Sequence, residues 1–243
     1  MAKKIFLTVV LTSIAMMVGT DISHAAPEKT VEPLPTSAIE REIASFSPEL
    51  PEDTLGNVED GEEIFNEIKY SENPWLDIER LSDRDAYSLL AYVNTLPTPQ
   101  GKVRYPGEGS DFFMALNEKI ACVRQVGALN CSKANALAQK AQRDADYRFP
   151  GRMHNGGPGD AFRHCWWSAS MTTDISESVA KIVGDNHEKY VSKDSYSPED
   201  REMDLFNNAQ GRWAAVASNF KWQEAVELCD SWTNNGILRV NNP

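Results

Sequence analysis

Apolar residues recur at spacings of three and four through most of the chain after residue 60. That spacing places them on one face of a helix, and the alternation typical of β-strands is almost absent. Segments around Ile64 and Leu89 already follow it. It predicts further helices over residues 110–126, 132–147, 160–173, 176–191, 198–218 and 221–233. We therefore expect an all-α fold, a single helical-bundle domain of about six to eight helices with an extended N-terminal tail.

The first 25 residues have the pattern of a signal peptide. Two lysines precede an apolar run from Ile5 to Val18, and the small residues Ser23 and Ala25 follow at the positions that a cleavage site requires. The run is short for a transmembrane anchor, which needs roughly 20 apolar residues. We expect a protein without a transmembrane anchor that is periplasmic or secreted.

Residues 26–58 are rich in proline and in acidic side chains. Such a segment buries too little apolar surface to offset the entropy lost on ordering it, so we expect a mostly extended acidic tail. The pattern allows one short helix over Ile39–Ala44. The all-helical domain is then expected over residues 59–243, with its motifs concentrated in about 115–215.

All four cysteines lie after the expected cleavage site, in a chain destined for an oxidising compartment, and three pairings are open to them. Cys122 and Cys131 are close together, across an expected joint between two helices, which leaves Cys165 and Cys229 to link later helices. The alternative makes Cys165 a metal ligand beside His164, but adjacent side chains on a helix diverge. We therefore expect the disulfides Cys122–Cys131 and Cys165–Cys229.

The formal net charge of −12 and the pI near 4.8 limit the kind of partner. Binding to nucleic acid or to an anionic membrane requires a basic face, so we expect neither. An envelope-derived substrate or a protein partner remains compatible with this charge.

The candidate chemistry begins with the three histidines of the expected mature chain, His154, His164 and His187. Imidazole transfers protons near neutral pH and binds transition metals. Asp160 lies four residues before His164, so the two side chains share a helix face, and Asp160 is also the expected N-cap. Arg163, on the neighbouring flank, can stabilise an anion.

A second polar stripe runs along the expected helix 198–218. Asp204, Asn208 and Arg212 follow one another at intervals of four and therefore share a face. Two adjacent asparagines and Gly211 cost helix stability, and a functional face can impose such a cost. The alternative is that the stripe is only the hydrated face of the helix.

Taken together, the polar residues form three ordered motifs. They are His154-Asn155 with Asp160-Ala161-Phe162-Arg163-His164-x-x-Trp167, then Asp185-x-His187-Glu188, then Asp204-Leu205-x-Asn207-Asn208-x-x-Gly211-Arg212. This set resembles the HN…DAxRHxxW, DxHE and DLxNNxxGR signatures of an uncharacterised all-helical bacterial domain family, found in secreted proteins and at the ends of larger toxin-like chains. The resemblance implies a helical fold and a shared site, but no particular reaction. Cys165 inside the central motif is a departure.

These observations favour an exported hydrolase. In it His164 activates water, Asp160 or Asp204 orients the imidazole, and a cation stabilises negative charge. The expected catalytic residues are Asp160, Arg163, His164, Asn208 and Arg212. The expected ligands of a divalent metal, zinc or calcium, are His154, His187 and Asp204. We expect these residues to converge on one pocket.

The sequence does not choose among a phospholipid, a peptidoglycan fragment and a peptide as substrate. The rival hypothesis is a non-enzymatic envelope binding or immunity-type protein, in which the polar motifs form a buried hydrogen-bond network that fixes helix packing.

Overall fold

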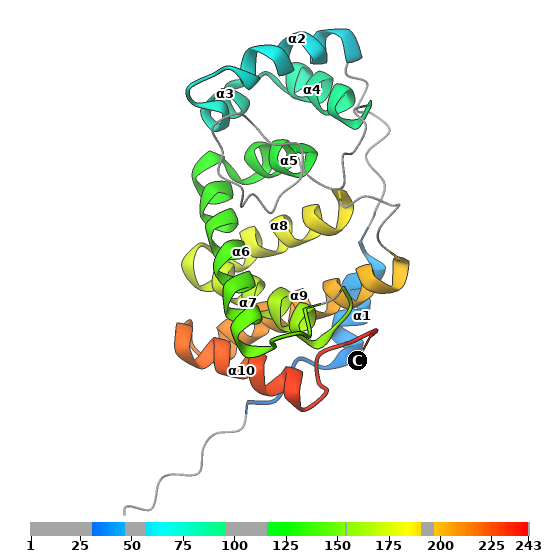
Figure 1. The fold of residues 1–243 in the computed structure, drawn as a ribbon, viewed down its shortest axis with the longest axis vertical. Coiled ribbons are helices and arrows are strands. Elements are labelled where there is room, and N and C mark those ends of the chain that lie inside the picture. The colour runs from blue at the N-terminus through cyan, green and yellow to red at the C-terminus, as the bar shows by residue number, and fades with distance from the viewer. Residues whose placement is uncertain (1–30, 47–56, 96–115, 154, 191–196, 243) are drawn as a thin grey trace, which may run out of the picture. The chain divides into compact units, whose positions relative to one another are not determined.

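The computed structural model describes residues 31–46, 57–95, 116–153, 155–190 and 197–242. These residues form one compact unit and contain helices but no strand, so the expected all-α class is confirmed (Figure 1). The signal-peptide segment lies outside the described residues. The helices are α1 (Thr36–Ala44), α2 (Val58–Lys69), α3 (Pro74–Arg80), α4 (Asp83–Thr95), α5 (Leu116–Val126), α6 (Ala128–Arg148), α7 (Pro158–Asp174), α8 (Glu177–Tyr190), α9 (Pro198–Ala217) and α10 (Trp222–Asn234).

The count of ten described helices exceeds the expected six to eight because short helices form where no long apolar pattern marks them. The start of the expected helix 110–126 lies outside the described residues up to position 115. Helix α6 begins four residues before the expected start, directly after Gly127, whose φ of 82° ends α5. Helix α9 begins as expected, with Pro198 in its first turn and a capping box between Ser197 and Asp200.

Helix α7 lies at the centre of the packing. It contacts α6, α8, α9 and α10, and most of its side chains are buried (Figure 1). Helix α2 packs on α3 and α4, and these two reach the rest of the fold through α5 and, for α3, also through α6; α5 in turn contacts α6 and α8. A polar side chain on α7 therefore faces other helices on nearly every side.

Two features bind the later helices to α7. The disulfide Cys165–Cys229 joins α7 to α10, as expected from the sequence. The second feature is the close approach of α9 to α7. A Cβ atom at Gly211 of α9 would lie 2.0 Å from the carbonyl oxygen of Cys165 on α7. The glycine inside α9 is thus explained by close helix packing, not by a functional face.

Helix α1 includes the short helix that the sequence allowed over Ile39–Ala44, but it packs on α9, which the expectation of an extended tail did not include. Ile39 is fully buried against Phe206 and Ala209. The side-chain amide of Gln210 donates to the carbonyl of Leu34 at 3.0 Å and accepts from its N–H at 3.0 Å. Composition underestimated this segment because a few apolar residues and paired backbone groups suffice when a preformed helix receives them.

Among the described residues, no helix is long and apolar enough to cross a membrane.

Candidate functional site

The candidate site is a cluster of buried charged and imidazole side chains between α7, α8 and α9. His164 on α7 is fully buried at its centre. Its Nε2 atom lies 3.3 Å from Oδ1 of Asp204 on α9 and 3.6 Å from Oδ1 of Asp160 one turn earlier on α7. The structure therefore brings Asp160, His164 and Asp204 together, as the shared helix faces predict.

Arg163 extends across the same group. Its Nε donates to Oδ1 of Asp160 at 3.2 Å, and its Nη2 lies 2.6 Å from Nε2 of His164. The expectation that Asp160 is the N-cap of α7 is wrong. The helix begins two residues before Asp160, at Pro158, and Gly157 is its N-cap. The carboxylate of Asp160 still serves the helix end by accepting the N–H of Gly156 at 2.9 Å.

Glu188 on α8 closes the other side of the His164 ring. Its Oε1 lies 3.8 Å from Nδ1 of His164 and accepts from Nδ2 of Asn208 at 3.3 Å. Asn208 in turn accepts from the hydroxyl of Ser168 at 3.2 Å. Asn208 thus joins the cluster through Glu188, and its side chain also acts directly on His164, where it favours a higher pKa; all of these side chains are buried.

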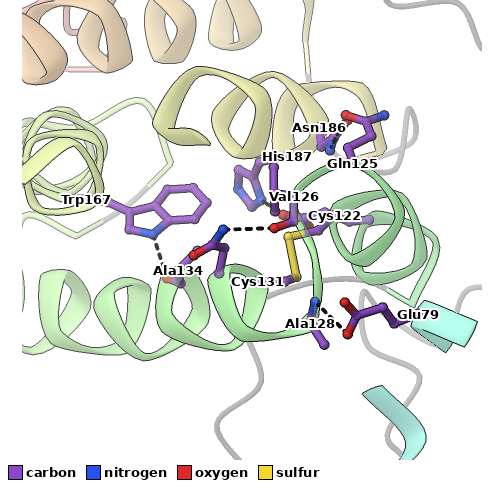
Figure 2. Close-up of a disulfide and its surroundings, with 12 residues drawn as sticks. Glu79, Cys122, Gln125, Val126, Ala128, Cys131, Ala134, Trp167, Asn186 and His187 are labelled. Atoms are coloured by element: carbon purple, nitrogen blue, oxygen red, sulfur yellow. Dashed lines mark hydrogen bonds and ion pairs between the residues drawn. A yellow bond between two sulfur atoms is a disulfide. The ribbon is translucent and has the colours of Figure 1, made fainter. Parts of the chain in front are cut away.

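His187 lies at the edge of the cluster, with its side chain 18% exposed. Its Nδ1 atom lies 3.1 Å from Oε1 of Glu118 on α5, and its ring centre lies 5.9 Å from that of His164. Figure 2 shows His187 and Trp167 beside the Cys122–Cys131 disulfide, which joins α5 to α6 as expected. That link helps to hold the helix that supplies Glu118.

A small cavity adjoins His187. It has a volume of about 30 Å³ and is lined by Ala138, Arg163, Trp167 and His187. A site of this size accommodates a water molecule or one small group. Arg163, with 21% of its side chain exposed, and His187 are the polar members of its wall, whereas His164 lies deeper.

The carboxyl groups of the cluster are pushed toward opposite protonation states. Burial opposes the charge of Asp160, but Arg163 and His164 outweigh it and lower the pKa of Asp160 to about 2. Burial, with His187 and Arg163 acting in the opposite direction, raises the pKa of Glu188 to about 7. Burial and the neighbouring carboxylates raise the pKa of Asp204 well above its usual range. Groups with such separated pKa values are typical of acid–base sites.

The two histidines are also shifted apart. Burial and the nearby guanidinium of Arg163 lower the pKa of His164 well below its usual range, so its imidazole is neutral. Burial acts in the same direction on His187, but Glu118 and Glu188 raise the pKa of His187. The cluster therefore contains a neutral imidazole beside one that favours its protonated form.

One expected site residue, Arg212, is not brought into this cluster, and one, His154, is not described. Arg212 pairs with Glu42 of α1, so its charge is used in holding the N-terminal helix on α9. His154 lies outside the described residues, so its expected role as a ligand stays a prediction.

Two acidic residues of the cluster, Glu188 and Glu118, are not among the site residues expected from the sequence. Glu188 stands in the DxHE motif next to His187, and that adjacency was the available signal. Glu118 carried no signal, because it lies in α5 and meets His187 only through tertiary packing.

Within the part of the chain that the structure describes, two groups of side chains have the spacing of a metal site, and His164 belongs to both. One consists of Asp160, His164 and Asp204; the other consists of His164, His187 and Glu188. In the first group the guanidinium of Arg163 already supplies a positive charge. The expected ligands His187 and Asp204 fall into different groups.

Fold and site together define a class of protein: an all-helical domain with two disulfides, built around a buried centre of carboxylates and imidazoles. Residues 122–236 match the family model of a domain of unknown function, DUF6973. This range contains all four cysteines and every residue of the cluster except Glu118. No solved structure matches the chain.

Proposed function

We propose that this protein is an exported hydrolase whose reaction takes place in the cavity between Arg163 and His187. The observation that carries the proposal is the composition of the cavity wall. One polar side chain there is a histidine held by a carboxylate, and the other is an arginine held by Asp160. A carboxylate-oriented imidazole and a fixed cation are the groups that activate water and stabilise the developing anion.

The roles follow from position in the wall. Glu118 holds Nδ1 of His187, which leaves Nε2 of that ring to act on water, directly or through a bound ion. Arg163 supplies the positive charge for the transition state. His164, which is fully buried, acts behind them: its Nε2 accepts from Nη2 of Arg163 and so helps to hold that guanidinium in place. Water activation therefore moves from His164, where the sequence placed it, to His187.

The size of the cavity and the charge of its wall limit the chemical group that can react there. A cavity of about 30 Å³ admits a carbonyl, ester or phosphoryl group but not the rest of a substrate molecule. The cation favours a group that becomes negative as water attacks. The motif resemblance to domains of secreted and toxin-like chains, together with the two disulfides, supports action on an envelope component: a phospholipid, a peptidoglycan fragment or a peptide.

The test is a hydrolysis assay on these three substrate classes, with and without added divalent metal, for the wild type and matched variants. We expect His187→Gln to lower kcat/KM at least about 100-fold, because acid–base groups contribute that much. Arg163→Lys is expected to lower kcat more than it raises KM. Arg143→Lys, on the exposed face of α6, is the control and should leave both unchanged. Folded protein without turnover on any class would contradict the proposal.

A structural role is the second candidate, and complete burial is the observation that favours it. His164 and Glu188 are 0% exposed, and a satisfied buried network can fix the packing of α7, α8 and α9. In that case the protein is a binding module. His187→Gln would then leave the binding of its partner intact, and His164→Gln would lower Tm sharply with no activity to lose.

A further inference from the structure

We propose that His164, His187 and Glu188 bind a divalent transition-metal ion, with zinc as the first candidate. The site goes beyond the expected ligand set of His154, His187 and Asp204, since only His187 is common to both. If the proposed function is correct, the ion supplies the activated water in the cavity, but metal binding itself does not depend on that function.

The ligand atoms are already close to the required spacing. One ligand atom from each of the three residues lies within 4.8 Å of the other two. Nδ1 of His164 and Oε1 of Glu188 are 3.8 Å apart. Two ligands at about 2.1 Å from one zinc ion are roughly 3.4 Å apart in a tetrahedral site. Small side-chain movements therefore complete the site.

Each histidine has a carboxylate at the ring nitrogen that points away from the proposed ion. Nδ1 of His187 is held by Glu118 at 3.1 Å, which leaves its Nε2 as the ligand atom. Nε2 of His164 is close to Oδ1 of Asp204 at 3.3 Å, which leaves its Nδ1. Metal-binding histidines characteristically donate their second N–H to such an acceptor, which fixes the ring and raises its basicity.

Nδ1 of His164 is the strongest single indication. It is completely buried and has no hydrogen-bond partner among the described residues. A buried polar atom without a partner is costly unless something else satisfies it. A metal at Nδ1 requires the ring proton on Nε2, which can then be donated to Oδ1 of Asp204. The guanidinium of Arg163 only donates, so its Nη2, now 2.6 Å from Nε2, must turn away from that nitrogen while it keeps its hydrogen bonds to Asp160.

Formal charge also favours a dication. Four buried carboxyl groups lie in or beside the cluster, namely Glu118, Asp160, Glu188 and Asp204. Among the described residues of the cluster, Arg163 contributes the one fixed positive charge, because His187 must give up its proton to bind the ion. Carboxylates that cannot all ionise together in a buried site become compatible when a divalent ion is added.

The donor set distinguishes between the two metals expected from the sequence. Calcium takes six to eight oxygen ligands, whereas two imidazoles and one carboxylate are a typical zinc set that leaves a position for water. The cavity lined by His187 and Arg163 provides room for that water. The group of Asp160, His164 and Asp204 is the weaker candidate, because Arg163 lies within it.

The experiment measures metal binding by the full chain, purified without a histidine tag and treated with a chelator. Zn²⁺ titration by calorimetry and metal analysis after dialysis should give one ion per chain at micromolar concentration or below. Co²⁺ in place of Zn²⁺ should give the intense visible absorption of a four-coordinate nitrogen and oxygen site.

Variants separate the site from non-specific binding. His187→Gln and Glu188→Gln should weaken Zn²⁺ binding at least about 100-fold, and Glu118→Gln about 10- to 100-fold through the ring that it orients. Glu177→Gln, an exposed position on the same helix, is the matched control and should bind as the wild type does. His187 is the safest variant for folding, since its side chain is 18% exposed; circular dichroism checks each one.

The inference is overturned if the folded chain retains no stoichiometric Zn²⁺, or if folded His187→Gln and Glu188→Gln bind it as tightly as Glu177→Gln does. These outcomes are distinct from failure of the proposed function. Zn²⁺ bound at this site without turnover supports the metal site and removes the hydrolase. Turnover by a chain that takes up no Zn²⁺ in the titration supports the hydrolase and removes the metal site.

Discussion

Asp160 illustrates how one residue serves the helix end and the candidate site together. Its carboxylate accepts the N–H of Gly156, binds Arg163 and lies near Nε2 of His164. These partners explain why the pKa of Asp160 falls to about 2 although the group is buried. The ionised form is therefore part of the stable fold, and its protonation must cost stability.

We predict that Asp160→Asn lowers the free energy of unfolding by about 2–3 kcal/mol at pH 7. The reason is that folding lowers the pKa of the wild-type carboxyl group from 3.8 to about 2. An acid whose pKa is lower in the folded than in the unfolded state stabilises the fold at pH values above its unfolded pKa. That stability disappears as pH falls from about 4 toward 2. The variant should therefore approach the wild type near pH 2. Urea denaturation at pH 7, 4 and 2.5 measures this.

Asp146→Asn, on the exposed face of α6, is the control for that series and should stay within about 0.5 kcal/mol of the wild type at each pH. A loss for Asp160→Asn that is the same at every pH would show that the missing carboxylate acts by shape and not by charge.

At the scale of elements, α9 uses side-chain amides to bind the backbone of two non-helical segments, one before α1 and one after α10. Gln210 makes two hydrogen bonds to Leu34, and Asn207 makes the equivalent two, each 3.0 Å, to Arg239 near the C-terminus. The motif that contains Asn207 and Asn208 is therefore divided between structure and site, because neighbouring positions on a helix face different directions.

We predict that Gln210→Ala loosens α1 without unfolding the rest of the molecule. The loss of two partly buried hydrogen bonds should lower the free energy that keeps α1 docked by about 1–2 kcal/mol. Cleavage by trypsin at Arg41 should accelerate about 5- to 30-fold, measured by mass spectrometry of timed digests. Gln223→Ala, an exposed position on α10, should leave the rate unchanged. Equal rates for the two variants would mean that Ile39 and the ion pairs hold α1 alone.

At the scale of the whole molecule, the two disulfides stabilise different parts of the fold: one joins α5 to α6 and the other joins α7 to α10. Cys122–Cys131 closes a loop across one helix joint, with a sequence separation of 9. Cys165–Cys229 spans a separation of 64 and links the central helix to α10. A longer loop removes more entropy from the unfolded chain, so the second bond constrains the fold more.

We predict that replacing Cys165 and Cys229 by alanine lowers the free energy of unfolding by about 4 kcal/mol, and replacing Cys122 and Cys131 by about 2.5 kcal/mol. Chemical denaturation of both double variants under oxidising conditions tests the order. The Cys122 and Cys131 variant has a second readout, because loosening α5 disturbs Glu118 and should weaken any function of His187. The reverse order of stability would indicate strain or residual structure in the unfolded state.

The sequence alone predicted the helices with clear apolar periodicity, the two cysteine pairings, and the convergence of Asp160, His164 and Asp204. Helical spacing fixes which side chains share a face, and two helices with polar inward faces satisfy those side chains by bringing the faces together. These inferences depend on local geometry, which the order of residues encodes directly.

Only the tertiary structure decided the rest. Glu118 meets His187 across 69 positions, Arg212 turns to Glu42 instead of the site, and the acidic N-terminal segment docks through α1. Each of these depends on which helix happens to pack opposite a given side chain. Long-range contacts of single residues leave no periodic signal, because their partners are chosen by the packing of whole helices and not by neighbours in the chain.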